Sequence, residues 1–214
     1  MTQLIKKINH KLLILTLASA ASSANAFDLG GMKLGVGPKL SLNANKASIG
    51  SAGSSSFGFG YGVGAYSVLD LDFVALELGL QYSERRFEFS NLLGFGGDYA
   101  ATLKQIEIPF LAYYKHSLGE TLALRAGAGA QLEFGVGDVK GDSGSVSYSQ
   151  AGVSKSSSSL LFDIGGDYVV SELGTITFDL RYALGLKDRA ESSGLLFNDK
   201  FKTQYIELAA GFLF

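Results

Sequence analysis

The last ten residues, Tyr205-Ile206-Glu207-Leu208-Ala209-Ala210-Gly211-Phe212-Leu213-Phe214 (205–214), alternate in character. Counted back from Phe214, every second residue is apolar, whereas the residues between them include Glu207 and Gly211. Side chains of a β-strand point alternately to the two faces of its sheet. The stretch therefore predicts a strand with one apolar face and one face of mostly small or polar residues.

The same alternation recurs upstream and predicts seven more strands. They lie at about 33–42, 57–66, 74–87, 103–115, 122–136, 160–170 and 175–187. Three short connections separate them at 70–72, 117–121 and 171–174. Four long connections, rich in Ser, Gly, Asn and Asp, cover 43–56, 88–101, 137–158 and 188–202. This order predicts an antiparallel up-and-down meander, with Pro38 and Pro109 inside strands, where proline usually marks a bulge or an edge.

The charged residues decide which face of the meander meets water. The interior of an eight-stranded barrel is only just wide enough for side chains to fill it, so it cannot hold eight rows of Phe, Leu, Ile and Tyr. Most glycines of the strands lie on the polar face, where a crowded lumen needs small residues. Both observations favour apolar side chains facing lipid and polar ones facing inward. The predicted fold class is all-β, an eight-stranded antiparallel up-and-down transmembrane β-barrel; a soluble barrel would have the opposite polarity.

Seven acids and seven bases fall on the inward face. They are Lys33, Lys39, Glu77, Arg85, Glu107, Lys115, Arg125, Glu133, Asp163, Asp167, Asp179, Arg181, Lys187 and Glu207. Buried charges are costly unless they are paired, so equal numbers predict a lumen charge network that fills the barrel. The alternative is a narrow pore lined by the same groups.

The N-terminus has the layout of a secretory signal peptide. Lysines at 6, 7 and 11 precede the apolar stretch 12–18, and Ala24-Asn25-Ala26 supplies small residues before Phe27. We expect cleavage after Ala26, which divides the chain into a signal peptide at 1–26 and a barrel domain at 27–214. No stretch of the mature chain has 18 consecutive apolar residues, as a membrane-spanning helix would.

Composition argues against most catalytic and cofactor chemistry. The chain has no cysteine and two histidines, which excludes a disulfide framework, a thiol nucleophile and a histidine cluster for zinc. A net charge of −2 gives no reason to expect a nucleic acid partner. The glycines of 58–64 recur every two residues, unlike a dinucleotide-binding loop. We therefore expect no catalytic, cofactor-binding or metal site.

Two local patterns leave minor alternatives open. His116, Ser117 and Glu120 are the residue types of a hydrolytic triad, which would suit a lipid-modifying barrel enzyme. Residues 138–144 have a faint likeness to a calcium loop, but Lys140 occupies a position where an oxygen ligand is needed. We expect a solvated turn histidine in the first case and a surface loop in the second.

Two segments carry a resemblance to known proteins. The alternating end, with Ile206, Leu208, Phe212 and Phe214, resembles the C-terminal assembly signal of bacterial outer-membrane proteins. The stretch 104–110 resembles the mid-barrel motif of the small outer membrane protein beta-barrel domain families, the PorT-like group included, and the architecture is similar to OmpX and OmpA-type barrels.

The resemblance implies a location and a set of partners. It implies the bacterial outer membrane, reached by secretion to the periplasm, with the barrel-assembly machinery and outer-membrane lipid as partners. Short turns would face the periplasm, and long loops would face outward and contact an extracellular ligand. Such families usually have no catalytic residues. We expect a monomer without a cofactor, acting in surface interaction or envelope structure.

Overall fold

The computed structural model describes residues 27–28, 32–49, 54–90, 98–141, 144–170, 173–190 and 201–214. The predicted signal peptide lies outside these residues. The long strands are β2 (Lys33–Ile49), β4 (Gly58–Asp70), β5 (Val74–Ser90), β6 (Asp98–Ser117), β7 (Leu122–Gly135), β10 (Ser156–Val170), β11 (Gly174–Gly185) and β12 (Phe201–Leu213). The short elements are β1 (Phe27–Asp28), β3 (Ser54–Ser56), β8 (Val139–Gly141), β9 (Gly144–Val146) and the helix α2 (Tyr148–Ala151).

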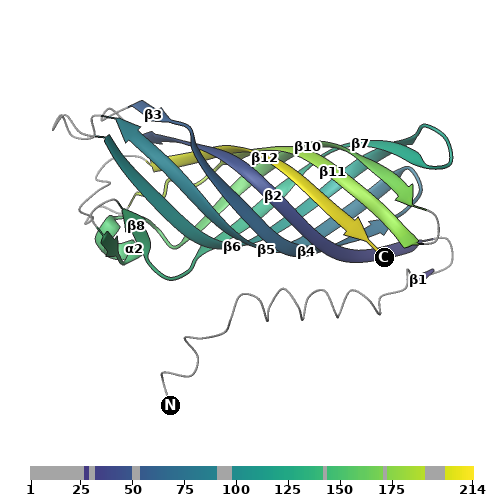
Figure 1. The fold of residues 1–214 in the computed structure, drawn as a ribbon, viewed down its shortest axis with the longest axis horizontal. Helices are drawn as coiled ribbons and strands as arrows, with labels where there is room; N and C mark the ends of the chain where they lie inside the picture. The colour runs from purple at the N-terminus through teal and green to yellow at the C-terminus, as the bar shows by residue number, and fades with distance from the viewer. Residues whose placement is uncertain are drawn as a thin grey trace, which may run out of the picture.

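Each long strand pairs in antiparallel orientation with the long strand before and after it in the sequence. The last strand, β12, pairs with β2 and closes the sheet into a barrel. Figure 1 shows the tilted strands, with β8 and α2 at one end, here called the loop end, and the C-terminus near the other, the turn end. The predicted eight-stranded antiparallel barrel is confirmed. Within the described residues, no helix is long and apolar enough to cross a membrane.

The two faces of the strands have the predicted polarity through the middle of the barrel. On β10, Phe162 is 50% exposed on the outside, whereas Asp163 is 2% exposed on the inside. On β11, Leu180 and Arg181 alternate in the same way. Because the outward side chains would meet acyl chains, and the inward ones meet each other, a single alternating pattern serves both environments.

All eight long strands exceed the length that a membrane crossing requires, and three of them exceed it by the most. β2 and β5 have 17 residues each and β6 has 20, against the about 9–11 residues that span a bilayer. The positions 43–49, 88–90 and 98–101, expected in long connections, therefore belong to strands and extend the barrel at the loop end. This part of the prediction was wrong.

The reason is a reversal of polarity along the strands. Beyond the apolar band, the inward side chains of β5 are Phe87 and Phe89, while Arg86 and Glu88 face outward. On β6, Leu103 is buried while Lys104 faces outward. Outside the bilayer the surroundings are water, so a strand there has the polarity of a soluble protein. The apolar-outward pattern stops where the membrane stops, although the strand continues.

Pro109 lies within β6 without a bulge. Leu78 pairs with Phe110 and Gln81 with Glu107, so the register between β5 and β6 is the same on both sides of the proline. Its ring occupies the space in front of Gly79, where a Cβ atom would lie 2.8 Å from the proline Cγ. The lack of a side chain at Gly79 therefore accommodates the proline in the lumen.

Candidate functional site

The centre of the lumen is organised around Arg181 of β11, which is 1% exposed. Its Nε donates to Asp163 Oδ2 of β10 at 2.8 Å, and its Nη2 donates to Glu77 Oε1 of β5 at 3.1 Å. Its Nη1 lies 3.6 Å from Glu207 Oε1 of β12. One guanidinium thus joins carboxylates from three other strands. Charge-assisted hydrogen bonds of this kind are roughly twice as strong as neutral ones.

The network continues toward the turn end through alternating charges. Lys39 Nζ lies 2.8 Å from Glu77 Oε1 and 3.1 Å from Asp179 Oδ2. Arg125 forms ion pairs with Asp179 and with Asp167, the latter at 3.3 Å between Nε and Oδ1. Every member is buried, so each charge replaces its lost hydration with an opposite charge or a hydrogen bond.

The turn end of the network is partly open to solvent. Lys115 forms ion pairs with Asp70 and with Asp167, at 3.5 Å between Nζ and Oδ2 of the latter. The side chains of Lys115 and Asp70 are 14% and 29% exposed. Asp70, at the end of β4, was not among the residues that the sequence predicted for the lumen.

Toward the loop end, a second group surrounds Arg85. Its Nη2 lies 2.7 Å from Glu107 Oε1, and Ser83 also donates to this carboxylate. The Arg85 guanidinium stacks on the Tyr205 ring, 3.3 Å from the ring centroid. Cation–π contacts of desolvated groups are worth about 2 kcal/mol. The Glu107 carboxylate and the Tyr205 ring together fix the position of the Arg85 side chain in the lumen.

The third group uses a residue from a connection. Arg189, between β11 and β12, is fully buried and donates from Nη1 to Gln105 Oε1 at 2.7 Å and to Glu133 Oε2 at 3.1 Å. Ser154, before β10, donates its backbone N–H to the Arg189 carbonyl at 2.7 Å. Burial lowers the pKa of Arg189 below its usual value, although the nearby Glu133 carboxylate partly opposes this shift. Arg189 therefore ties two connections to the upper lumen.

At the loop end, beyond Arg189, buried apolar side chains pack together in a group here called the mouth cluster. Its members are Ala47, Phe87, Phe89, Ala101, Leu103, Val139, Tyr148, Ala151, Val153 and Phe201. The rings of Phe87 and Phe201 meet edge to face, with centroids 5.8 Å apart. Tyr148, from α2, donates its hydroxyl to the Lys104 carbonyl at 2.6 Å, and burial raises its pKa to about 12.

The predicted lumen charges divide into three groups. Eleven are buried inside the barrel, namely Lys39, Glu77, Arg85, Glu107, Arg125, Glu133, Asp163, Asp167, Asp179, Arg181 and Glu207. Lys115 is half-buried at the turn end. Lys33 and Lys187 are exposed, which corrects their prediction as lumen residues. Lys33 is the first residue of β2, and Lys187 follows the end of β11, so neither has a facing wall of strands.

Apart from Asp70 at the end of β4, the lumen and mouth residues that the sequence did not reveal come mainly from connections. Arg189, Tyr148 and Val153 lie in the segments predicted as long loops, where no alternation identifies an inward side chain. One signal was available. Without Lys33 and Lys187, which lie at strand ends, the predicted lumen acids outnumber the predicted lumen bases. Neutralising the remaining carboxylates therefore requires a further cation from outside the strands.

The C-terminal residues form the closing edge of the barrel. Ile206 and Leu208 face outward and are 45% and 61% exposed. The rings of Phe212 and Phe214 pack edge to face with centroids 4.8 Å apart. The Phe214 N–H donates to the Val36 carbonyl at 3.1 Å, which continues the contact between the last strand and β2. Their predicted role as an assembly signal stays a prediction.

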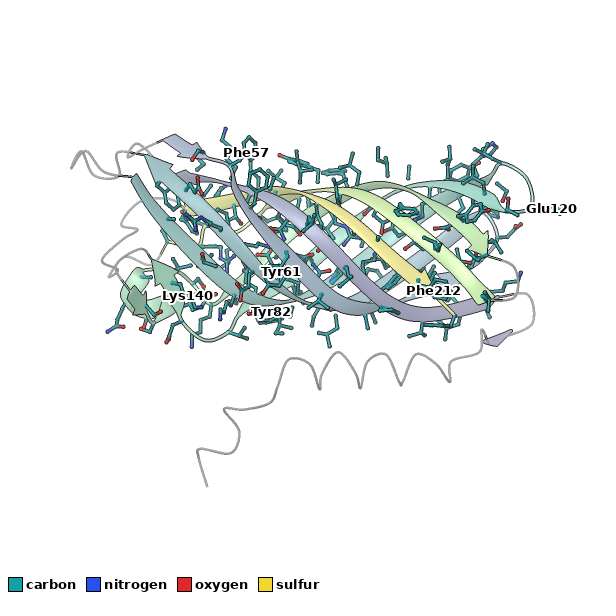
Figure 2. All side chains as sticks on the ribbon, in the orientation of Figure 1. Phe57, Tyr61, Tyr82, Glu120, Lys140 and Phe212 are labelled. Atoms are coloured by element: carbon teal, nitrogen blue, oxygen red, sulfur yellow. The ribbon has the colours of Figure 1, made fainter. Side chains whose placement is uncertain are left out.

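The minor alternatives receive no geometric support. His116, Ser117 and Glu120 are exposed, and no described hydrogen bond joins their side chains. Glu120 lies at the turn end in Figure 2. Of the calcium-loop likeness at 138–144, positions 142 and 143 lie outside the described residues. Within the described ranges, no group of three or more His, Asp or Glu side chains is placed to hold a metal ion.

Comparison with known proteins agrees with this architecture. The family described as "Outer membrane protein beta-barrel domain" matches residues 20–191. The outer membrane protein OprG from Pseudomonas aeruginosa is similar at a TM-score of 0.50 and 15% identity, over 86% of this chain and 96% of that one. Among curated proteins, none matches the sequence.

Two further solved structures are similar at 15% identity. Neisserial surface protein A has a TM-score of 0.48, over 83% of this chain and 95% of that one. Ail, the attachment invasion locus protein of Yersinia pestis, solved with the heparin analogue sucrose octasulfate, has a TM-score of 0.44, over 85% of this chain and 99% of that one.

Proposed function

The chain belongs to the outer membrane protein beta-barrel domain family, and from this premise we propose that it is a closed, non-conducting barrel that acts through its loop end. It is a protein of the bacterial outer membrane, in contact with membrane lipid. We place the loop end outside the cell and the short turns in the periplasm. The function is then surface interaction or envelope structure.

The observation that carries the proposal is the double closure of the lumen. The charge network fills the middle of the barrel, and the mouth cluster covers the loop end with apolar side chains. A permeant ion would have to pass buried ion pairs and then the mouth cluster, in which the rings of Phe87 and Phe201 meet edge to face. This arrangement supports a structural interior over the narrow pore that the sequence left open.

A planar-bilayer recording tests the closure. We expect no stable open conductance from the purified wild-type barrel. Replacing Arg189 by Met leaves Glu133 without its cation and removes the guanidinium donors to Gln105 Oε1 and to the Ser154 carbonyl. We expect brief openings, because the connection that carries Arg189 is then held less firmly to the lumen.

The control is Lys187→Met, which removes an exposed cation two residues away. It should leave the recording silent. A large, steady conductance from the wild type would overturn the closed barrel and favour a pore.

The surface role rests on the part of the barrel that extends beyond the apolar band. β5 and β6 stay paired as far as Ser90 and Asp98, and the connection from β7 to β10 packs on them through β8 and α2. The result is a folded platform with its own apolar core. Figure 2 shows Lys140 on this platform, at the end opposite Glu120.

Adhesion of whole cells tests this role. Bacteria displaying the wild-type barrel should be retained on a host-cell or matrix surface several-fold better than bacteria displaying a barrel whose residues 140–145 are replaced by a Gly-Ser turn. That change keeps Tyr148, Val153 and Arg189, so the mouth stays closed. Equal retention of both strains would leave envelope structure as the role.

The remaining expectations complete the proposal. Residues 1–26 direct secretion and are removed, and the C-terminal residues Phe212 and Phe214 are read by the barrel-assembly machinery. The barrel is a monomer, and we assign it no enzymatic activity or cofactor. The exposed, unlinked positions of His116 and Ser117 support that assignment.

A further inference from the structure

A polar patch lies on the outside of the barrel where β2 meets β12. Lys46 pairs with Gln204 across the two strands, and Ser48 pairs with Lys202. All four side chains face away from the lumen, because the residues that alternate with them are the buried ones. These four residues, Lys46, Ser48, Lys202 and Gln204, are called the seam patch below.

The seam patch begins where the apolar outer surface ends. Toward the turn end, the next outward residues are Ala44 and Leu42 on β2 and Ile206 and Leu208 on β12. Tyr182 of β11 donates its hydroxyl to Gln204 Oε1 at 3.0 Å. The Lys46 ammonium lies 5.7 Å from the centroid of the Phe57 ring. Aromatic residues with a polar partner are typical of the level of lipid head groups, so the patch lies at that level.

The cations of the seam patch have no acidic partner among the described residues, whose ion pairs involve neither Lys46 nor Lys202. The neighbouring sector of the same level differs. There Arg86 pairs with Glu88 at 3.0 Å, and Lys104 pairs with Glu84 at 3.5 Å. The excess of positive charge is therefore local to the junction of the first and last long strands.

We propose that the seam patch binds the phosphate group of a membrane lipid in the leaflet at the loop end. Two ammonium groups, the Ser48 hydroxyl and the Gln204 amide supply donors on one side of the barrel, which suits an anion with several acceptor oxygens. Lysine stems can lie along the apolar surface while their ammonium groups reach the head-group layer. The apolar rows of Leu42 and Leu208 beneath the patch receive the acyl chains. The occupant is a lipid because this surface continues directly into the lipid-facing band.

The expected effect follows from the charge. A lysine near an anionic membrane surface contributes about 1 kcal/mol, so removal of two should weaken binding roughly thirtyfold at about 1.4 kcal/mol per tenfold. The attraction should weaken further as salt is raised, because the patch is exposed.

Native mass spectrometry of the purified barrel in detergent measures this directly. The probes are bisphosphorylated lipid A and the same lipid without its phosphates. The wild type should retain the first and lose the second, and Lys46→Gln/Lys202→Gln should retain the phosphorylated probe roughly thirtyfold less. Lys33→Gln, which removes an exposed cation at the turn end, should behave as wild type.

Three results would overturn the proposal. They are equal retention of both probes by the wild type, wild-type retention by the double variant, and full competition by inorganic phosphate at the probe concentration. A gel-mobility shift on heating shows that each variant is folded. The outcome is independent of the closed lumen, because the seam patch lies outside it and a conducting barrel would still carry it.

Discussion

Replacement of Arg181 by methionine should destabilise the barrel by about 3–5 kcal/mol, because it leaves buried carboxylates without their cation. Glu77 keeps Lys39 as a partner, but Asp163 has no other described cation and Glu207 keeps only the hydroxyl of Ser41 and the amide of Gln81. Denaturation by urea in detergent, followed by the loss of the heat-sensitive gel mobility of the folded barrel, measures the change.

A matched variant separates burial from charge. Arg86→Met removes an arginine that forms one ion pair with Glu88, both side chains being 48% and 42% exposed. Exposed pairs contribute about 0–1 kcal/mol, so this barrel should unfold close to wild type. Similar losses for the two variants would show that the lumen network contributes no more than a surface pair. If Arg181→Met yields no folded protein, Arg181→Lys keeps the charge and should recover part of the loss.

Replacement of Leu180 by arginine should cost about 2–4 kcal/mol, since it places a charge on the lipid-facing side near the centre of the bilayer. Leu180 lies outward between Ile164 and Leu208, in the middle of the apolar row of β11 that runs from 176 to 184. The measurement is the midpoint of urea unfolding from lipid vesicles. Vesicles are used because a detergent micelle could rearrange around the added charge.

Thr102→Arg is the control for this effect of depth. Thr102 pairs with Arg86 beyond the apolar band, so an added arginine there should change stability by about 0–1 kcal/mol. A large loss at Thr102, or none at Leu180, would contradict the boundary of the membrane that the reversal of polarity indicates.

Alternation was enough to predict the barrel and most of its interior. Phe162 and Leu180 face outward, so the side chains that alternate with them along each strand had to face inward. The same alternation placed Asp163, Arg181 and Glu207 inside the barrel. It could not identify their partners. Strand register, which the sequence does not state, decides that Arg181 reaches Glu77 rather than Glu107.

The rule failed where the solvent changes. Phe87 and Leu103 are inward and apolar, although the same faces are polar a few residues away, because these ends of β5 and β6 stand in water rather than lipid. Arg189 and Tyr148 reach the lumen from connections, where side-chain direction depends on tertiary packing and has no period. The mouth cluster was therefore beyond prediction from the sequence.

The junction of β2 and β12 has a consequence for biogenesis. Ser41 and Glu207 touch across it although they are 166 positions apart, and every pair along it spans a similar length of chain. Until the final strand arrives, a nascent chain presents two unpaired edges, the form most prone to aggregation. The barrel therefore cannot close before the last strand is present, and closure joins the two ends of the chain in one late step.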